Sequence, residues 1–536
     1  MLGWRQSLDQ NSKEHRGEVP QGEAIIIGAG IGGLTSAMLL AARGVAVTVC
    51  EAQAAPGGKL REVMAGGHAI DGGPTVFTMR DVFEELFFAA GASLDEEVPM
   101  RHAEVLARHA WGADRLDLFA DIDRSADAVR DLAGAREAEG FRRFMAEAGH
   151  IHRTLDRPFL RAAKTNPIGL TWRMGLRGFA DLNSIRPYQT LWAALGDHFR
   201  DPRLKQLFGR YATYAGSSPF RCPATLMLIA HVEASGVWLV DGGMHKLAQG
   251  LERVAKRHGA RFRYEAPVSE ILVEHGRAAG VLLASGERIA AERIICNGDP
   301  AALAAGRFGP AVRRATSGTR PRDRSLSALV WTAPVTATGF PLVRHNVFFS
   351  QDYPAEFAAL DAGRVPDDPT IYLCAQDRDD AGARATDGTE RVQIIMNAPA
   401  RGDQAAPTPA ELSQWTDRMH ATLARSGLSL DLAPGSVLTT PAGFATLFPQ
   451  TGGALYGRAS HGWAASFRRP GARTRIPGLY LAGGGTHPGA GVPMAALSGR
   501  LAALALLHDR ASTSVSIRRA MPGGISTPSA MTDAMG

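Results

Sequence analysis

Cysteine is scarce in this chain of 536 residues. Its four cysteines form no CxxC pair and no cluster with histidine. Apolar residues surround each of them in the sequence, so we expect buried free thiols, without a disulfide framework or a metal site. Such usage is typical of the reducing cytoplasm. The four residues are Cys50, Cys222, Cys296 and Cys374.

A long uninterrupted hydrophobic run is also lacking. Residues 24–40 are the stretch most easily mistaken for one, but they contain four glycines, are short for a membrane span and follow a polar leader of 22 residues. These features exclude both a transmembrane helix and a secretory signal peptide as interpretations of this stretch. We expect the chain to have neither.

A strong charge of one sign is lacking as well. Lys and Arg number 59, and Asp and Glu number 53, which gives a formal net charge of +6. This excess is too dispersed to indicate a nucleic-acid partner, although it suits an anionic membrane surface. With 45% hydrophobic and 21% charged residues, the composition is that of a folded globular protein with more than one domain.

What the sequence does contain is a strand–turn–helix–strand pattern near its start. A short, largely β-branched run over residues 24–27 leads into G-x-G-x-x-G, whose glycines permit a tight turn and the close approach of a pyrophosphate. A second strand ends in an acid, placed to accept hydrogen bonds from a ribose. We therefore predict that a dinucleotide is bound by Gly28, Gly30, Ile31, Gly32, Gly33 and Glu51.

Two further glycine pairs favour a flavin over a nicotinamide. A nicotinamide dehydrogenase needs no second glycine pair followed by a cation directly after the ribose-binding acid, whereas flavoproteins similar to the amine oxidases have one. The alternative is an ordinary hairpin turn with a solvated lysine. The two groups that we assign to the cofactor site are Gly57, Gly58 and Lys59, and Gly72, Gly73 and Pro74.

A second glycine-rich turn lies near the other end of the chain, before an apolar helical pattern. One large cofactor, FAD, explains why two such turns are present. The first helix N-terminus receives the pyrophosphate, and the second directs N–H groups at the pyrimidine edge of the flavin, where negative charge gathers on reduction. At this turn we assign Gly483, Gly484, Gly485, Val492, Pro493 and Met494 to the cofactor site.

The remaining patterns indicate a substrate domain inserted between pieces of the FAD-binding domain. Residues 75–230 have mainly helical periodicity, and residues 320–470 alternate strand-like runs with polar turns. We expect a flexible leader (1–22), an FAD-binding domain in three parts (23–100, 236–310 and 471–510), a helical substrate and membrane-contact region (101–235), a substrate domain (311–470) and a disordered tail (511–536).

Residues 157–186 combine basic and large apolar side chains. The segment carries six basic residues and one acid, Asp181, with Trp172, Met174, Leu176 and Phe179 among them. This mixture is what contact with a membrane interface requires. A helix pair with a solvated basic face is the alternative.

Together, these motifs resemble those of a known family. GAGIGGL, DGGPTVFT, LFPQTGGALYG and GLYLAGGGTHPGAGVPMAALSG are similar to motifs of the bacterial carotenoid desaturases of the phytoene desaturase type. Within that family, SLSALVW, PTIYLCAQDR and LTTPAGFATLFPQTGGALYGR resemble the 1-hydroxycarotenoid 3,4-desaturases (methoxyneurosporene dehydrogenases) of phototrophic bacteria. One departure is that Lys59 stands where many relatives have Arg, which keeps the charge but loses the bidentate fork.

The resemblance implies an α/β fold, with a discontinuous Rossmann-like FAD-binding domain of the amine oxidase/GDI-like type and an inserted mixed-sheet and helical substrate domain. In that family, the backbone at the position of Val268 holds the adenine end of the cofactor. The implied activity uses non-covalent FAD to form the C3–C4 double bond of 1-hydroxycarotenoids such as 1-hydroxyneurosporene, in spheroidene/spirilloxanthin-type carotenoid biosynthesis.

The resemblance also implies where the protein works. A carotenoid does not dissolve in water, so the substrate comes from a lipid bilayer. This places the protein peripherally on the cytoplasmic face of the inner or photosynthetic membrane, with residues 157–186 as the docking segment. The electron acceptor is oxygen or a quinone.

No catalytic base follows from these patterns. His487 lies in the second glycine turn and His461 in the segment before it, and a structural or cofactor-adjacent role suits each better than that of a proton acceptor. His231 and Glu233 either face the substrate pocket or form a buried pair.

Three other functions compete with this interpretation. The nearest is another carotenoid enzyme, a phytoene desaturase or a carotenoid isomerase, which product analysis would separate. A soluble flavin oxidase similar to the amine or protoporphyrinogen oxidases would turn over without lipid. A non-enzymatic protein similar to the GDP-dissociation inhibitors would bind no flavin and be colourless.

Overall fold

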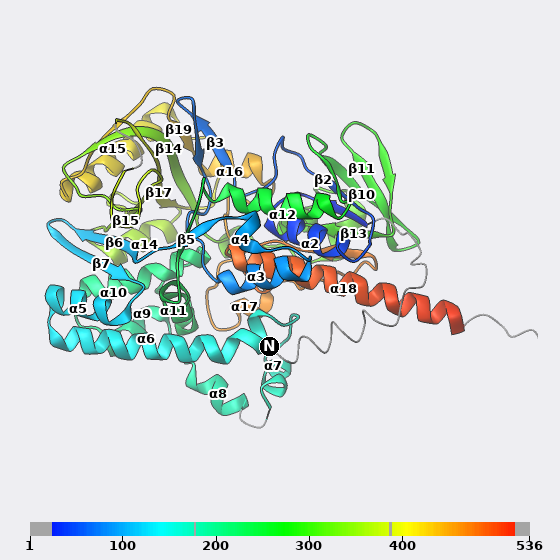
Figure 1. Cartoon of the computed structure of the whole chain (residues 1–536), viewed down its shortest axis with the longest axis horizontal. Helices are drawn as coiled ribbons and strands as arrows, with labels where there is room; N and C mark the ends of the chain where they lie inside the picture. Colours follow the sequence, from blue (N-terminus) through cyan, green and yellow to red (C-terminus); the bar gives the residue numbers. More distant parts are fainter. Residues whose placement is uncertain (1–23, 176–177, 385–387, 520–536) are drawn as a thin grey trace, which may run out of the picture.

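The computed structural model describes residues 24–175, 178–384 and 388–519 (Figure 1). One half of the molecule is built on a parallel sheet of five strands in the order β20–β13–β1–β2–β9. The strands come from three distant stretches of the chain, so the sheet joins the start of the described chain to a strand close to its end. They are β1 (Ala24–Ile27), β2 (Val47–Cys50), β9 (Arg261–Arg263), β13 (Arg293–Cys296) and β20 (Leu479–Leu481).

Different layers cover the two faces of this sheet. Side chains alternate along a strand, so Ala24 and Ile26 of β1 join a core with helices, while Ile25 and Ile27 join a core with a small antiparallel sheet. The helices are α2 (Ile31–Ala41), α3 (Arg80–Ala89), α12 (His245–Arg257) and α18 (Val492–Arg519). The small sheet consists of β10 (Val268–Glu274), β11 (Arg277–Leu283) and β12 (Arg288–Ala290).

The other half is built on a mixed sheet in the order β18–β14–β17–β16–β15–β6–β7, with β19 also paired to β14. Val347 of β15 faces a core with a helical layer, and the next residue, Phe348, faces a separate core on the side of α15 (Pro409–Arg425). The strands are β6 (Val105–Trp111), β7 (Asp114–Phe119), β14 (Ser327–Thr338), β15 (His345–Phe348), β16 (Ile371–Ala375), β17 (Glu390–Ala398), β18 (Ser429–Leu432) and β19 (Val437–Thr439).

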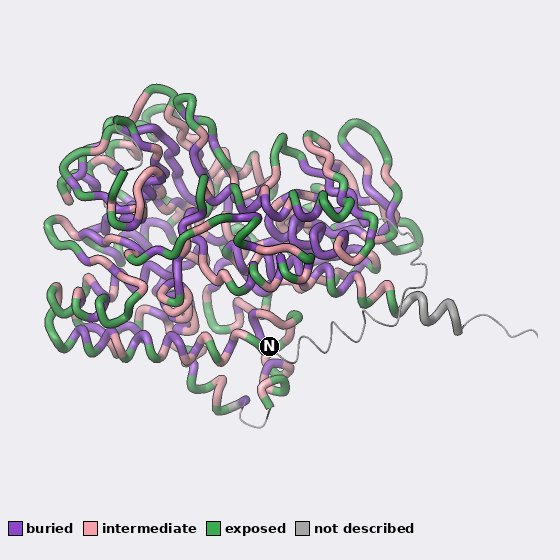
Figure 2. The backbone as a smooth tube through the Cα atoms, viewed as in Figure 1, coloured by how far each residue is buried: buried purple, intermediate pink, exposed green. Residues whose placement is uncertain are grey.

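The helical layer lies under the mixed sheet and ends in a projection formed by α7 and α8 (Figure 1). Its elements are α5 (Ile122–Ala133), α6 (Ala135–Leu155), η1 (Asp156–Leu160), α7 (Pro167–Arg173), α8 (Gly178–Ser184), α9 (Leu191–His198), α10 (Pro202–Gly209), η3 (Arg210–Ala215), η4 (Ala224–Met227) and α11 (Leu228–Ala234). Burial is continuous through the two sheets, whereas the projection is largely exposed (Figure 2).

Short elements complete the described chain. The strands are β3 (Glu62–Ala65), β4 (His68–Asp71), β5 (Met100–His102) and β8 (Trp238–Val240). The helices are α4 (Leu94–Glu97), α13 (Pro300–Ala305), η5 (Pro310–Ala315), η6 (Pro321–Asp323), α14 (Tyr353–Asp361), α16 (Pro441–Leu447) and α17 (Ala465–Arg468).

This architecture confirms the predicted fold class and corrects two details. The region expected to be helical from residue 101 starts with β6 and β7, because β6 pairs in parallel with β15, more than two hundred residues further on. The segment expected to be disordered from Ala511 starts as helix, because α18 continues to Arg519. Residues 1–22 and 520–536 lie outside the described residues. All four cysteines are buried free thiols, as predicted.

Candidate functional site

The first glycine turn connects β1 to α2 and has no room for side chains. A Cβ on Gly33 would lie 2.1 Å from the carbonyl oxygen of Gly28, and a Cβ on Gly30 would lie 2.6 Å from Asn297 Nδ2. Gly30 is the N-cap of α2 and offers no side chain to the first-turn N–H groups. These donors therefore remain available to a ligand, as the G-x-G-x-x-G pattern predicts.

The two glycine turns meet in space. A Cβ on Gly32 would lie 2.6 Å from the backbone nitrogen of Gly483 and 2.7 Å from Asn297 Oδ1. Behind this contact, Ser36 Oγ donates to the carbonyl of Gly499 across 3.0 Å, so α2 and α18 pack closely. Oδ1 of Asn297 is buried and has no hydrogen-bond partner among the described residues. Two glycine turns that expose backbone, with the unpartnered Asn297 Oδ1 between them, form a cradle that fits a bound dinucleotide.

Glu51 closes one side of the first turn. Its Oε2 accepts a hydrogen bond from the Ala29 backbone at 2.6 Å, and its Oε1 accepts one from Gln53 at 2.8 Å. The residue retains 8% of its accessible surface. The backbone of Ala266 donates to the backbone carbonyl of Glu51, which holds the segment that leads into β10, at Val268, beside the end of β2. Glu51 and Val268 thus lie at the same end of the cradle, where the adenosine part is expected.

The segment after Glu51 packs its glycines directly against backbone. Gly57 donates to the carbonyl of Ala29 and forms a bridge with Gly30. A Cβ on Gly73 would lie 2.0 Å from the carbonyl oxygen of Lys59, so the second glycine pair packs against the backbone that directly follows the first. Pro74 follows, and Gln393 Nε2 of β17 donates to the carbonyl of Gly73 at 2.9 Å. The glycines assigned to the cofactor site after Glu51 are brought together.

Lys59 is not the solvated lysine of an ordinary hairpin. Its Nζ donates to the carbonyl of Leu455 at 2.6 Å and lies 5.2 Å from the centre of the Phe448 ring. Burial lowers the pKa of Lys59, an effect that Asp299 opposes and Arg469 reinforces. Its charge therefore lies inside the protein, toward the second glycine turn.

Arg469 braces this second turn, a role that no sequence pattern predicted. The residue is 3% exposed, and its guanidinium donates to the carbonyls of Tyr456, Gly484 and Arg458 at 3.0, 3.0 and 2.7 Å. Burial lowers its pKa to about 10. A Cβ on Gly485 would lie 2.6 Å from Pro300, so α13 limits this side of the turn.

Helix α18 starts after this turn, where the sequence predicts the flavin-edge donors. Val492 and Pro493 are buried. Met494 packs against the core of the nucleotide half and also against the core of the helical layer. The N-terminus of α18 therefore lies at the junction of the two halves, a suitable place for a reactive group that must face a substrate.

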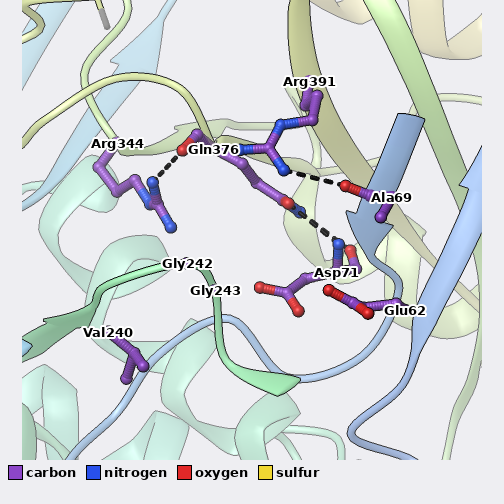
Figure 3. Close-up of a pocket in the computed structure, with 9 residues that line it drawn as sticks. All are labelled: Glu62, Ala69, Asp71, Val240, Gly242, Gly243, Arg344, Gln376 and Arg391. Atoms are coloured by element: carbon purple, nitrogen blue, oxygen red, sulfur yellow. Dashed lines mark hydrogen bonds between the residues drawn. The ribbon is translucent and has the colours of Figure 1, made fainter. Parts of the chain in front are cut away.

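A small polar cavity of about 60 Å³ lies between β4, the turn at residues 242–243 and the mixed sheet (Figure 3). Asp71 accepts hydrogen bonds from the backbone of Met244 and His245, and the Gln376 side chain pairs with both the N–H and the carbonyl of Asp71. Burial raises the pKa of Asp71. The cavity has room for about two waters and therefore cannot hold a dinucleotide. The hydrogen bonds of Asp71 instead fix the start of the 72–74 segment.

The histidines in the glycine-rich region have structural partners. His487 Nε2 donates to the carbonyl of Ala162 at 2.9 Å, and its ring meets the Phe159 ring edge-on. His461 Nε2 accepts a hydrogen bond from the Ser218 backbone at 3.1 Å. Burial lowers the pKa of each histidine to about 4.

His231 and Glu233 are not partners of each other. They lie two residues apart on α11 and so point to different sides. Glu233 accepts hydrogen bonds from the hydroxyls of Tyr211 and Tyr214, whereas His231 faces the ring of His152 at 5.2 Å. Of the two alternatives for these residues, the structure contradicts the buried His–Glu pair, because the tyrosines satisfy the carboxylate.

The 157–186 segment forms η1, α7 and α8. Ile168 and Trp172 are 71% and 81% exposed and lie one helical turn apart on α7. Of the basic residues, Arg161 pairs with Asp81, Glu85 and Asp156, and Arg186 pairs with Glu147 and Asp197. Leu176 and the side chain of Phe179 lie outside the described part. The segment therefore has an exposed apolar pair on α7, but two of its arginines are used in ion pairs within the fold.

Among the described residues, no helix is both long and apolar enough to cross a membrane. Those residues also contain no cluster of His, Cys, Asp or Glu that could hold a metal ion.

Comparison with known families gives one match along most of the chain. The family described as "Flavin containing amine oxidoreductase" matches residues 31–507. A hydroxyneurosporene desaturase of Rubrivivax gelatinosus is 50% identical over 95% of this chain and 98% of its own length. A second one, of Cereibacter sphaeroides, is 47% identical over 92% and 99%.

More distant relatives agree in fold. A 1-hydroxycarotenoid 3,4-desaturase of a Flavobacterium species is 29% identical over 90% of this chain and 98% of its own. Among solved structures, an oxidoreductase of Methanosarcina mazei matches with a TM-score of 0.56 and 16% identity, over 91% of this chain and all of that one. The structural likeness shows the fold alone.

Proposed function

Because this chain belongs to the flavin-containing amine oxidoreductase family, within its carotenoid desaturases, we propose that it forms the C3–C4 double bond of 1-hydroxycarotenoids such as 1-hydroxyneurosporene. The observation that carries the proposal is near full-length identity of 50% to a hydroxyneurosporene desaturase. The two glycine turns that meet at Asn297 support it, because they form the cradle that a flavin dinucleotide requires.

The cofactor in this proposal is non-covalent FAD. Gly28 to Gly33 present N–H groups to the pyrophosphate, Glu51 accepts from the ribose, and the backbone at Val268 faces the adenine end. When bound, FAD supplies the acceptor for two hydrogens taken from adjacent carbons of the substrate.

The remaining cofactor contacts come from both halves of the site. The two inner glycine pairs with Lys59 and Pro74, and the turn at residues 483–485, provide the backbone surface against the ring system. The backbone N–H groups of Val492 and Met494, at the start of α18, face its pyrimidine edge and stabilise negative charge there, while Pro493, which has no N–H, fixes the backbone between them. The protein excludes water and orients the polyene, and no side chain is assigned as a base.

The substrate reaches this site from a bilayer through the face around α7. Ile168 and Trp172 supply the exposed apolar contact, and Arg157, Lys164 and Arg173 lie near them in the sequence. A cavity of about 600 Å³ beside α7 is lined by Arg157, Arg173 and Met174, and one of about 840 Å³ by Lys164, Arg468 and Arg475. Basic and apolar groups side by side suit the cytoplasmic face of the inner or photosynthetic membrane. Oxygen or a quinone then reoxidises the flavin.

One assay tests this function. The FAD-loaded protein is incubated with liposomes that carry either 1-hydroxyneurosporene or phytoene, and products are followed by absorbance and mass. We expect loss of two hydrogens from the hydroxylated substrate alone, with a red-shifted spectrum. Turnover of phytoene instead, or isomerisation without mass change, would overturn the regiochemical assignment. A colourless protein without flavin would favour a binding protein.

The same liposomes test the docking face. Trp172→Ala removes the most exposed apolar side chain of α7, and we expect several-fold less protein to sediment with anionic liposomes, because interfacial burial of an indole is lost. Trp463→Ala, at a tryptophan that is 47% exposed, is the matched control. Equal sedimentation of wild type and Trp172→Ala would exclude α7 as the docking face.

A further inference from the structure

A chain of polar side chains crosses the mixed sheet beside the candidate cofactor site. The hydroxyl of Tyr372 on β16 lies 2.6 Å from Thr75 Oγ1 and 2.8 Å from His345 Nδ1 of β15. Thr75 directly follows Gly72, Gly73 and Pro74, the segment assigned to the flavin. The polar chain therefore starts one residue beyond the cofactor site.

The surroundings of this chain are mostly apolar. In the sheet register Tyr372 lies opposite Val347 on one side and Ile395 on the other, and directly paired residues share a face. Val347 belongs to the core of the helical layer, and Tyr372 packs against that same core. A polar group among such apolar neighbours needs hydrogen-bond partners.

The phenol of Tyr372 has one hydrogen-bonding position beyond those used by Thr75 and His345. A tyrosine hydroxyl offers one donor and two acceptor sites. If Tyr372 donates to His345 Nδ1, Thr75 donates to it; if His345 donates, Tyr372 donates to Thr75. Either histidine tautomer leaves one more acceptor site on Tyr372, and the neighbour of that site is the thiol of Cys374, a weak donor that a hydroxyl can displace. Tyr372 is also incompletely buried, whereas His345 and Thr75 are 2% and 8% exposed.

Both ring groups stay neutral at physiological pH. Burial, together with the charges of Arg344 and Arg210, lowers the pKa of His345 to about 3. Burial raises the pKa of Tyr372 well above its usual value. The chain is thus suited to a neutral hydroxyl partner and does not present an ion to the apolar substrate.

We propose that Tyr372 accepts the hydrogen bond of the substrate's tertiary hydroxyl, and that Thr75 and His345 are positioning residues that hold the phenol. The inference rests on the proposed function. In a 1-hydroxycarotenoid a single methylene separates the carbinol carbon from C3, so a group that recognises the hydroxyl has to lie beside the reacting carbons. A polar chain one residue from the cofactor segment meets that requirement.

Selectivity between two substrates tests the proposal. Neurosporene has the same polyene as 1-hydroxyneurosporene but no hydroxyl. The ratio of their kcat/KM values for 3,4-desaturation is measured in liposomes for the wild type and for Tyr372→Phe. We expect Tyr372→Phe to lower the ratio about 10- to 100-fold, the range for losing one buried hydrogen bond, with little change on neurosporene. A substitution that only disturbs the structure would lower kcat/KM for both substrates by the same factor and leave the ratio unchanged.

Two further variants keep the test decisive. Thr75→Val should lower the ratio by a smaller factor and Thr75→Ser should restore it, because only the serine can still hold the phenol. Tyr480→Phe removes another buried hydroxyl, one that donates to Asp509, and should leave the ratio unchanged. Flavin absorbance and thermal midpoint confirm folding of each variant.

The outcomes separate the two proposals. A ratio that stays within twofold of the wild type in both Tyr372→Phe and Thr75→Val would overturn the role of Tyr372 and leave the proposed function intact. Failure of the wild-type protein to desaturate 1-hydroxyneurosporene would overturn the proposed function itself, and with it the hydroxyl site.

Discussion

The two glycine-rich turns look alike in the sequence but are built differently. The turn at residues 28–33 is tightened within its own β1–α2 unit, where Gly33 faces the Gly28 carbonyl, and its other glycines lie against Asn297 and Gly483. The turn at residues 483–491 is held from outside, by Arg469, by Pro300 and by the contact of His487 with Ala162. A similar composition therefore hides one turn whose tightest contact is local and one whose contacts come mainly from distant segments.

Substitution of glycine should give the largest difference between the two turns. Gly33→Ala places a Cβ 2.1 Å from the Gly28 carbonyl, so the backbone has to move, at a cost of about 3 kcal/mol or more. We expect little folded, FAD-loaded protein. Gly484→Ala in the second turn meets no protein atom closer than 3.9 Å, so the chain should fold in wild-type yield, and any loss of flavin would come from the Cβ entering the cofactor site. The yield of folded protein and the flavin absorbance per purified chain measure both, and a fully loaded Gly33→Ala protein would contradict the first turn's geometry.

Removal of the outside brace should affect the second turn. Arg469→Met keeps a similar volume but leaves three carbonyls, those of Tyr456, Arg458 and Gly484, without this donor. We expect a loss of about 2–4 kcal/mol in the free energy of unfolding and weaker FAD binding. Urea titration and flavin fluorescence measure these effects. Arg288→Met, at an exposed pair with Glu274, is the control and should cost less than half as much.

Lowering the pH should destabilise the second turn but not the first, because residues 28–33 contain no histidine. His487 has a folded-state pKa of about 4, lowered from 6.5 chiefly by burial. Between these values the unfolded chain binds more protons, so the stabilisation is complete above pH 6.5 and is lost as the pH falls toward 4. This linkage amounts to about 3 kcal/mol at the acid end.

The variant His487→Gln isolates that effect. Its amide can still donate to the Ala162 carbonyl but does not titrate, so the free energy of unfolding should fall less between pH 7 and pH 4 than in the wild type. Denaturant titrations at both pH values give the comparison. Parallel pH dependence in the two proteins would show that His487 does not couple the turn to pH.

The first turn and the fold class could be predicted from the sequence because their signals are local. Glycine spacing, the β-branched strand and Glu51 all lie within one supersecondary unit. Asn297 and Arg469 could not be predicted in the same way, since each gains its role from chain segments that are distant in the sequence. The NGD step after β13, where Asn297 stands, was the one available hint.

Two other differences have the same physical origin. Strands β6 and β7 were missed because β6 receives its pairing from β15, and its alternation along residues 105–111 is weak on its own. The basic character of residues 157–186 was visible, but the sequence could not tell that Arg161 and Arg186 are used in ion pairs with distant acids. Of the predicted membrane-contact character of this segment, the structure shows the exposed apolar pair Ile168 and Trp172.

The contact between Gly32 and Gly483 has a consequence for how the protein matures on the ribosome. Strand β1 is synthesised early, yet its cradle is completed by the turn before α18, almost the whole chain later. Contacts of such long sequence separation form late in folding. Cofactor loading should therefore be post-translational, and nascent chains halted before residue 483 should retain no flavin.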